Sequence, residues 1–411
     1  MKQIKLGLIG AGERGANCYA PYALKYPAEV KFVCVAEPIE DRRNTFGDRH
    51  EIPEEDRYMD WKEMLEKHYE LNGIIIATQD REHYEPAMAS ISKGYSLLLE
   101  KPMAETAQKT KEIVEAAEDK GVLLMVCHVL RYTPFFKAMK EVIDSGIIGE
   151  IKSIHHIENI GYWHFAHSYV RGNWSNTEET TPMIVAKCSH DTDIFNFLLS
   201  GKKCKRLSSF GSLSYFTEKN APEGATKSCK DCPHNKTCMY SAYKYLEDRK
   251  LRKNFKDIIL RTEDNQEFLD YLMTTPYARC VYHCDNNAVD HQVVTMEYED
   301  GTTVSWQASA FTMDIIRHTK IMGTKGEIEG CIDEDEFKIK DFATGHVTTV
   351  NIHTPKTLHS GGDECIMENF IKALQNSEKN HSFSARLSLQ GHDMAYAAEY
   401  SRLQGGKVVE L

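Results

Sequence analysis

A glycine pattern near the start of the chain could hold a dinucleotide. Gly10, Gly12 and Gly15 form a G-x-G-x-x-G sequence that follows the apolar run Ile4–Ile9 and opens a helical stretch. The first glycine permits a tight turn, the second lets the backbone approach a pyrophosphate, and the third allows close packing of helix and strand. The N-terminus of the helix offers N–H groups to the phosphates. The turn residues that we assign to this predicted nucleotide site are Gly10, Gly12, Glu13, Arg14 and Gly15.

An acidic residue follows at the position where a ribose would need it. Glu37 comes directly after the second apolar run, Val30–Ala36, and 22 residues after Gly15. Its carboxylate would accept hydrogen bonds from ribose hydroxyls and repel a 2′-phosphate, which favours NAD over NADP. Arg42 and Arg43 weaken that preference, because a guanidinium could hold the phosphate.

A second group of reactive side chains lies near the middle of the chain. Lys187, His190 and Asp191 stand at positions i, i+3 and i+4, so they share one face if the segment is a helix. His190 is the best candidate for a general base, because an imidazole titrates near neutral pH. Lys187 could orient His190, bind a substrate oxygen or serve as a second proton-transfer group. The alternatives are a buried structural histidine and a solvated lysine.

Aromatic and polar residues precede this group and suit a sugar. Flat rings match the C–H faces of a sugar and polar groups match its hydroxyl edges, while Arg171 would also suit a carboxylate or phosphate. A well-packed loop is the alternative. The candidate substrate residues here are Trp163, His164, Tyr169, Arg171 and Trp174. His359 and Asp363 are weaker candidates for the same cleft.

Closely spaced cysteines suggest a structural metal. Cys229, Cys232 and Cys238 have the spacing C-x2-C-x5-C, and thiolates on a loop suit zinc or an iron–sulfur cluster. Such a metal would brace the loop rather than do chemistry, and free thiols or a disulfide are the alternatives. The candidates for a fourth ligand are His234, Cys280 and Cys284.

Two domains must position these residues. Up to residue 127, short apolar runs alternate with helical stretches such as Thr106–Lys120, which predicts βαβ units and a parallel sheet covered on both faces. The predicted strands are Ile4–Ile9, Val30–Ala36, Gly73–Ala77, Tyr95–Leu99 and Leu123–Cys127. We therefore predict an α/β Rossmann domain over residues 1–127.

The pattern of apolar and polar residues changes after residue 150. Longer runs such as IKSIHHIENI, TTVSWQASAF and KIMGTKGEIEG alternate with period two, which predicts a mostly antiparallel sheet with one free face. Helices follow at Glu364–Gln375 and Ser388–Ser401. We predict an α+β domain over residues 128–411, with a cysteine-bearing insertion at about 218–270.

Composition narrows the partners. The chain has 411 residues and a formal charge of −11, which disfavours nucleic acid or an anionic membrane as the main partner. We see no signal peptide and no apolar run long enough to span a bilayer. Twelve cysteines scattered through strands and helices suggest reduced thiols. These features predict a cytoplasmic protein.

Motifs along the whole chain resemble those of the Gfo/Idh/MocA family, the glucose–fructose oxidoreductase and inositol dehydrogenase group. They are GLIGAGERG, IIIAT followed by His83, EKPMAET, GIIGEIKSI, SHDTDIFNFLL and HSGGDECIMENFIKAL. The resemblance implies a Rossmann domain followed by an open-faced mixed α/β domain. It also implies a role for the lysine of the EKP motif, Lys101, between the nicotinamide and the substrate. The cofactor residues that it adds are Thr78, His83, Glu100 and Lys101.

The resemblance implies an NAD-dependent oxidoreductase that acts on a sugar, inositol or related polyol and forms a homo-oligomer. Its dehydrogenases usually carry Asp-x-x-x-His, but here Ala186 stands at the Asp position and Lys187 follows. That departure keeps a second hypothesis open, a redox-neutral NAD-dependent glycosidase or lyase. A non-catalytic dinucleotide-binding regulatory protein is the third, and the presence of Lys101 and His190 argues against it.

Overall fold

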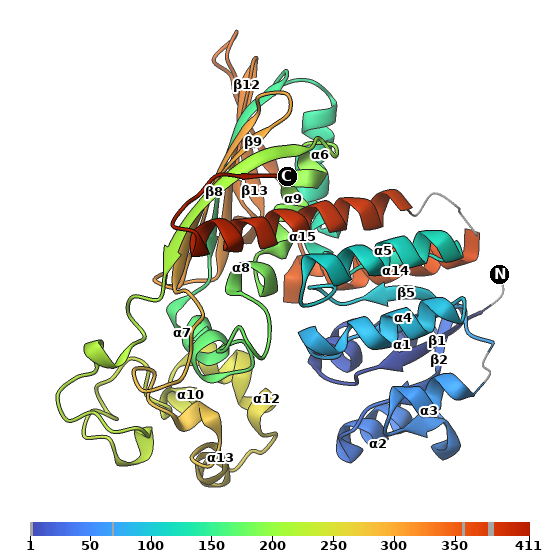
Figure 1. The fold of residues 1–411 in the computed structure, drawn as a ribbon, viewed down its shortest axis with the longest axis vertical. Coiled ribbons are helices and arrows are strands. Elements are labelled where there is room, and N and C mark those ends of the chain that lie inside the picture. Colours follow the sequence, from blue (N-terminus) through green and yellow to red (C-terminus); the bar gives the residue numbers. More distant parts are fainter. Residues whose placement is uncertain (1–2, 68–69, 356–357, 377–381) are drawn as a thin grey trace.

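The computed structural model describes residues 3–67, 70–355, 358–376 and 382–411, and its two sheets belong to two lobes (Figure 1). The N-terminal sheet is parallel throughout, in the order β3-β2-β1-β4-β5-β6. That order is the one found in dinucleotide-binding Rossmann folds, so the predicted fold class is confirmed for this half. The strands are β1 (Ile4–Ile9), β2 (Val30–Ala36), β3 (Arg57–Tyr58), β4 (Gly73–Ile76), β5 (Ser96–Leu99) and β6 (Leu124–Val126).

The second sheet is mixed, in the order β14-β13-β12-β11-β7-β10-β9-β8-β15. Its neighbours pair antiparallel except for β7 and β10, which run parallel, so the predicted mostly antiparallel sheet is confirmed. The strands are β7 (Ile151–Asn159), β8 (Cys204–Ser212), β9 (His291–Tyr298), β10 (Thr303–Ser309), β11 (Ile316–Gly323), β12 (Gly326–Cys331), β13 (Glu336–Asp341), β14 (Val347–Asn351) and β15 (Val409–Glu410).

The sequence pattern missed three short or exposed strands and merged two others. β3 and β15 have two residues each, too few for a period-two pattern, and β14 is mostly exposed. The run KIMGTKGEIEG covers the end of β11 and most of β12, which form a hairpin around Thr324 and Lys325. The turn residues there interrupt the apolar alternation only briefly.

Helices cover both faces of the Rossmann sheet, and two of them come from the end of the chain. α14 (Gly362–Asn376) buries Ile366, Met367 and Phe370 against one face, and α15 (Ser382–Leu403) adds Leu389 to the cluster on the other. Burying large apolar side chains contributes about 1.5–3 kcal/mol each, so these helices tie the C-terminal lobe to the N-terminal one. The remaining helices on this sheet are α1 (Pro21–Lys25), α2 (Glu40–Arg49), α3 (Trp61–Glu66), α4 (Tyr84–Ser92) and α5 (Ala107–Lys120).

Between the sheets lie the helices that carry the second group of reactive residues. α8 (Met183–Ala186) ends just before Lys187, and α9 (Ser189–Leu198) carries His190 and Asp191. α9 packs against α15 and α6 (Pro134–Asp144), so its reactive residues are held by buried contacts. α7 (Tyr162–Phe165) follows β7 and leads into a π-helical segment, Ala166–Arg171.

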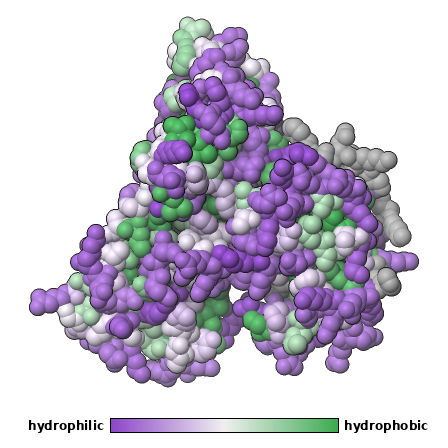
Figure 2. All heavy atoms as spheres, viewed as in Figure 1, coloured by the Kyte–Doolittle hydropathy of each residue, from purple (hydrophilic) through white to green (hydrophobic). Residues whose placement is uncertain are grey.

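The cysteine-bearing insertion forms a small lobe of its own beneath α7 (Figure 1). Its helices α10 (Lys244–Glu247), α11 (Arg249–Leu251), α12 (Asp257–Ile259) and α13 (Asn265–Leu272) close over a core that includes Tyr245, Phe255 and Phe268. The space-filling view shows the surface hollowed between this lobe and the Rossmann domain (Figure 2). No helix among the described residues is long and apolar enough to cross a membrane.

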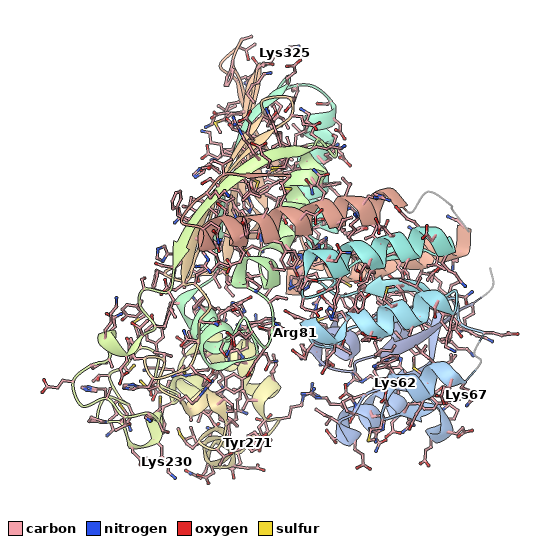
Figure 3. All side chains as sticks on the ribbon, in the orientation of Figure 1. Lys62, Lys67, Arg81, Lys230, Tyr271 and Lys325 are labelled. Atoms are coloured by element: carbon pink, nitrogen blue, oxygen red, sulfur yellow. The ribbon has the colours of Figure 1, made fainter. Side chains whose placement is uncertain are left out.

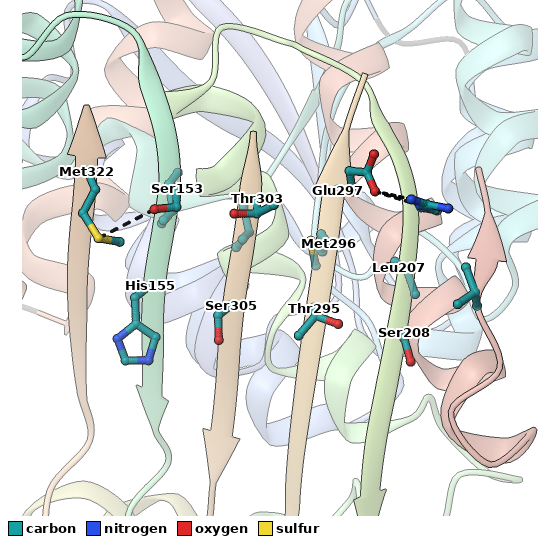
Figure 4. A pocket seen from close by; sticks show the side chains of 14 residues that line it. Ser153, His155, Leu207, Ser208, Thr295, Met296, Glu297, Thr303, Ser305 and Met322 are labelled. Atoms are coloured by element: carbon teal, nitrogen blue, oxygen red, sulfur yellow. Dashed lines mark hydrogen bonds and ion pairs between the residues drawn. The ribbon is translucent and has the colours of Figure 1, made fainter. Parts of the chain in front are cut away.

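Among the described residues, no helix covers the outer face of the second sheet (Figure 1). A shallow hollow of about 550 Å³ lies on it, lined by side chains from β7, β8, β9 and β10 such as Ser153, His155, Thr295 and Ser305 (Figure 4). Two apolar side chains from β8 and β9, Phe210 and Val293, are directly paired on the same sheet and exposed.

Candidate active site

The glycine turn has the geometry that the sequence predicts. Gly10 adopts φ +91°, and a Cβ on Gly15 would lie 2.2 Å from the Gly10 carbonyl oxygen, so neither position accepts a side chain without strain. A Cβ on Gly12 would meet no heavy atom closer than Arg42 Nη1 at 4.0 Å. The space above Gly12 is thus open to a ligand, and a pyrophosphate fits there. The helix that follows, Glu13–Tyr19, is π-helical rather than α-helical.

Glu37 lies beside this turn and is buried. Its Oε2 accepts a hydrogen bond from Ala11 N at 2.8 Å, and its Oε1 accepts one from Ile39 N at 3.0 Å. Arg43 donates to the carbonyl oxygen of Glu37 at 2.6 Å. Glu37 therefore joins the glycine turn to the end of β2, and its carboxylate is held at the strand end where a ribose would lie.

Glu100 is an internal carboxylate rather than an exposed one. Arg14 Nε donates to Glu100 Oε1 at 2.7 Å, Lys101 N donates to Oε2 at 2.8 Å, and the Tyr19 hydroxyl also donates to Oε1. Although burial opposes ionisation, Arg14 and Lys101 hold the pKa of Glu100 below its usual value. The sequence predicts that Arg14 and Glu100 both belong to the cofactor site, and in the structure their side chains form an ion pair with each other.

Arg14 also reaches the C-terminal part of the chain. Its Nη2 lies 2.7 Å from Asp363 Oδ1, and its Nη1 lies 3.2 Å from His359 Nδ1. His359 in turn contacts Asp363 Oδ2 at 3.1 Å. Although burial would raise it, His359 and Arg14 lower the pKa of Asp363 to about 2. The weaker candidates His359 and Asp363 thus lie next to the nucleotide turn.

Two further cofactor candidates hold the backbone of the site. His83 is buried, with its Nδ1 2.7 Å from Pro102 O and its Nε2 3.1 Å from Thr78 O. Thr78 donates its hydroxyl to Glu82 O at 3.0 Å. His83 therefore links the end of β4 to the turn after Lys101.

Lys101 lies where the two lobes meet. It follows β5, and its Nζ donates to the carbonyl oxygen of Ala186, the last residue of α8, at 2.7 Å. Burial lowers the pKa of Lys101, and the neighbouring cations Arg14 and Lys187 lower it further. The carboxylates Glu100 and Asp80 raise it, but the net shift is downward. The two stretches that the sequence singled out, around residues 101 and 187, are in direct contact.

His190 is 5% exposed and faces a ring of other titratable groups. Its ring centroid lies 5.9 Å from that of His128 and 5.9 Å from that of His359. Burial lowers the pKa of His190 well below its usual range, and Lys101 lowers it further. A neutral imidazole beside an ammonium group is suited to accept a proton.

Lys187 is paired with a carboxylate that the sequence pattern did not reveal. Its Nζ lies 3.4 Å from Glu158 Oε1, and Arg317 Nε lies 2.9 Å from Glu158 Oε2. Arg317 Nε also donates to Asp191 Oδ1 at 2.7 Å, and His156 Nε2 lies 3.0 Å from the same atom. Burial raises the pKa of Glu158, whereas Arg317 and His156 outweigh burial and lower that of Asp191 to about 2. Lys187, His190 and Asp191 therefore do not act as one group, because Asp191 is held inside an ion network.

No sequence pattern singles out Glu158 or Arg317, because each is one polar residue in an otherwise ordinary strand. They are direct neighbours across β7 and β11. Only that pairing shows that they share a network with α9. A glutamate at an inward position of a period-two strand was the available signal.

The aromatic and polar candidates have different surroundings. Trp163 and Tyr169 are buried, and Trp163 Nε1 donates to Met313 O at 3.2 Å. Trp174 Nε1 donates to Asp80 Oδ2 at 3.0 Å. His164 is half-buried, and burial and the cation of Lys187 lower its pKa. Of this group, His164 is the one whose electrostatics connect it to the lysines.

Arg171 holds the insertion in place through its guanidinium group. It is buried, and its guanidinium donates to Arg279 O at 2.7 Å and to Tyr240 O at 2.6 Å. Both carbonyls belong to the insertion and its return, so Arg171 fastens that lobe to the segment after α7. Backbone oxygens therefore take the Nε and Nη2 donors of Arg171, and the expectation that it binds a substrate carboxylate or phosphate stays a prediction.

Contacts between the Rossmann domain and the loop before α8 close one side of this region. Arg81 Nε donates to Thr180 O at 3.1 Å, and Figure 3 shows Arg81 at the boundary of the two lobes. Asp80 accepts from both Trp174 and Thr181, the latter at 2.6 Å.

The cysteines of the insertion are free thiols. Cys229 Sγ accepts from Ala242 N at 3.4 Å and from Arg171 Nη2 at 3.7 Å. No group of three or more His, Cys, Asp or Glu side chains in the described ranges is arranged to hold a metal ion. The predicted zinc or iron–sulfur site at Cys229, Cys232 and Cys238 thus finds no support.

Comparison with known proteins gives the same picture over the whole chain. Residues 4–128 match the Gfo/Idh/MocA sequence model described as an oxidoreductase family with an NAD-binding Rossmann fold, and residues 140–411 match its C-terminal alpha/beta domain. A putative oxidoreductase, YteT of Bacillus subtilis, is 26% identical over 313 residues, which is 72% of this chain and 71% of YteT. The scyllo-inositol 2-dehydrogenase (NADP(+)) IolW of the same organism is 28% identical over 150 residues, 36% of this chain and 40% of IolW.

A solved structure of levoglucosan dehydrogenase in complex with NADH and levoglucosan has a TM-score of 0.73 at 17% identity, covering 100% of this chain and 99% of that one. At that identity the likeness shows the fold. The two family matches together span nearly all of the chain, and with the Rossmann order and the lysine at the lobe boundary they settle its membership. The chain belongs to the Gfo/Idh/MocA family of oxidoreductases.

Proposed function

We propose that this enzyme oxidises a hydroxyl group of a sugar, inositol or related polyol, with NAD as the hydride acceptor. The observation that carries the proposal is the Lys101–Ala186 hydrogen bond of 2.7 Å. It brings the lysine at the end of β5 against the end of α8, next to Lys187 and to α9, which carries His190. A substrate hydroxyl at this junction would meet one ammonium group and one neutral imidazole.

The roles follow from the chemistry of the two side chains. Lys101 donates a hydrogen bond to the reacting oxygen, and His190 accepts the hydroxyl proton. NAD, when bound, accepts the hydride. Lys187 contacts a further oxygen of the substrate, since its side chain is 17% exposed while its partner Glu158 is fully buried. His164, Trp163, Tyr169, Trp174 and Asp191 shape or support the pocket.

The glycine turn and Glu37 support NAD as the preferred dinucleotide. The buried carboxylate at the end of β2 would repel a 2′-phosphate. Thr78, His83 and Glu100 support the same site through hydrogen bonds to its backbone, and Arg14 supports it through its ion pair with Glu100. Glu13 is exposed at the start of the segment after the glycine turn and accepts a hydrogen bond from the Asn17 side chain at 2.6 Å, so it stays a candidate for cofactor contact. The relative IolW is named for NADP(+), so the preference within the family is not uniform.

The test is a screen of purified enzyme with NAD⁺ or NADP⁺ and a panel of free sugars, inositols and sugar acids, followed by absorbance at 340 nm. We expect NADH formation with at least one polyol. Lys101→Met should lower the rate by about 10²- to 10⁴-fold and leave NADH binding intact. Failure to bind either dinucleotide would overturn the proposal, as would undiminished turnover by Lys101→Met.

We also propose that the enzyme pairs with copies of itself through the free face of its second sheet. The exposed pair Phe210 and Val293 supports this, because unpaired apolar side chains on a flat sheet favour association. Light scattering of Phe210→Lys should show smaller particles than the wild type. An unchanged mass for this variant would contradict the proposed interface.

A further inference from the structure

Behind His190 lies a second histidine that the proposed reaction does not use. His128 follows β6 and is 1% exposed. It lies between α9, which contributes His190 and Asp193, and α15, which contributes Ser388 and His392. A polar ring that is so deeply buried and packs against the candidate base calls for a functional explanation.

One nitrogen of His128 is fully engaged. His128 Nδ1 lies 2.8 Å from Asp193 Oδ1 and 3.1 Å from Ser388 Oγ. Asp193 also accepts two hydrogen bonds from Arg131, one of them from Nε at 2.7 Å. Although burial opposes ionisation, Arg131 and His128 hold the pKa of Asp193 far below its usual value. A charged carboxylate at Nδ1 places the proton there and leaves the lone pair on Nε2.

The other nitrogen has no partner. Among the described residues, neither His128 Nε2 nor His190 Nδ1 has a hydrogen-bond partner, although both atoms are buried. An unsatisfied buried polar atom costs about 1–3 kcal/mol, so two of them on neighbouring rings are unusual. The rings are T-shaped to each other, with centroids 5.9 Å apart.

The third histidine of the cluster shows the contrast. His392 accepts from Met103 N at 3.0 Å through Nε2, and its Nδ1 lies 2.8 Å from the carbonyl oxygen of Ser388. Both of its nitrogens are satisfied, as expected of a structural histidine. His128 packs on both rings, with centroids 5.2 Å from His392 and 5.9 Å from His190, but only His128 and His190 each keep one buried nitrogen without a partner.

We propose that His128, oriented by Asp193, is a positioning residue for His190, and that its free Nε2 accepts a hydrogen bond from His190 Nδ1–H when the two neighbouring rings approach more closely than in this structure, where their centroids are 5.9 Å apart. This contact fixes the tautomer of His190, so that its Nε2 carries the lone pair that faces the substrate. When Nε2 takes the hydroxyl proton, the imidazolium is stabilised through His128 by the Asp193 carboxylate. An aspartate that orients a catalytic histidine in hydrolases acts in the same way.

The proton balance is simple. The O–H bond of the substrate breaks and its proton goes to His190 Nε2, while the C–H bond of the same carbon breaks and a C=O double bond forms. The hydride from that C–H bond goes to the oxidised nicotinamide of the proposed function, on which this inference rests. His190 then carries one positive charge, which burial and the cations Lys101 and Arg317 disfavour and which the Asp193 carboxylate behind His128 offsets. Asp193 and Arg131 stay charged, and burial keeps His392 neutral by lowering its pKa to about 3.

The experiment compares His128→Gln and His128→Ala with His50→Gln in the full-length enzyme. His50 is a partly buried histidine that packs on Phe32 and Phe46 at the far side of the Rossmann domain, so its loss controls for general destabilisation. We expect the His128 variants to lose roughly 10- to 100-fold in kcat at pH 7 with little change in KM. Their kcat should rise steeply up to pH 10, because hydroxide replaces the weakened base. Added imidazole should partly restore His128→Ala.

A purely structural role predicts lower thermal stability but the wild-type pH profile and no imidazole rescue, and that result would overturn the inference. If the wild type oxidises no polyol, the proposed function fails first. The contact can then still be tested by ¹⁵N NMR of the imidazoles. The His190 Nδ1 signal should show a bound proton in the wild type and lose it in His128→Ala. An unchanged signal would contradict the contact.

Discussion

The two sides of the site are built differently. On the Rossmann side, the reactive positions stand at or just after the carboxyl ends of β1, β2 and β5, and a short sequence motif identifies each of them. They are Gly10, Gly12, Glu37 and Lys101. On the other side, the reactive side chains come from β7, α9, β11 and the start of α14, and their partners lie up to 349 residues apart in the chain. The first side is set by local backbone geometry, the second by long-range ion pairing. Substitutions should therefore have different consequences on the two sides.

The largest effect should come from Arg14, which belongs to both sides. Arg14→Gln leaves the buried Glu100 and Asp363 without their cation, and breaking such a pair costs about 3–5 kcal/mol. Thermal and urea unfolding should show this loss together with weakened NADH binding. Lys111→Gln removes an exposed ion pair with Glu115 on α5 and should leave the unfolding transition unchanged. Equal transitions for the two variants would show that the Arg14 contacts do not couple the lobes.

The next effect separates two glycines of one motif. A Cβ at position 15 would lie 2.2 Å from the Gly10 carbonyl oxygen and 3.0 Å from Leu8 Cδ1, so Gly15→Ala should lower the stability of the cofactor-free protein by roughly 2–4 kcal/mol. Gly12→Ala meets no such atom, so it should keep that stability and lose NADH affinity by at least about tenfold. Calorimetry and NADH fluorescence measure the two quantities. A stable Gly15→Ala, or a Gly12→Ala that binds NADH normally, would break the distinction between packing and ligand approach.

These variants also show how much of the fold and of the site can be predicted from the sequence. The Rossmann strands, the glycine turn and Glu37 are predictable because continuous apolar runs and glycine spacing are local signals. The second sheet is predictable as a type, but the pairing of β7 with β11 is not, and it decides that Glu158 meets Arg317 and Lys187. Arg171 illustrates the same limit. Its residue type suits an anion, but its two carbonyl acceptors come from more than 65 residues away.

His190 tests the non-local side. Its pKa is lowered by burial and by Lys101, so it remains neutral, and able to accept a proton, at pH values well below 6.5. The kcat of the wild type should therefore show no acid limb near pH 6.5. His190→Asn should lower kcat by about 100-fold at constant NADH affinity. An acid limb centred at 6.5 that disappears in His190→Asn would mean that the histidine is solvated during turnover.

The smallest effect should be at Glu37, on the local side. Its two oxygens accept from Ala11 N and Ile39 N, so Glu37→Gln removes the charge of the group and, because an amide nitrogen cannot accept, one of these two hydrogen bonds. The repulsion of a 2′-phosphate then falls, while Arg42 remains near the turn, since its Nη1 would lie 4.0 Å from a Cβ on Gly12. We expect the ratio of NADP⁺ to NAD⁺ affinity to rise about tenfold, which corresponds to about 1.4 kcal/mol. Titration with both dinucleotides, with Glu297→Gln as the control from the free sheet face, measures this ratio. If it stays constant, Glu37 acts only by joining β2 to the glycine turn, and the cofactor preference must come from residues that no local motif identifies.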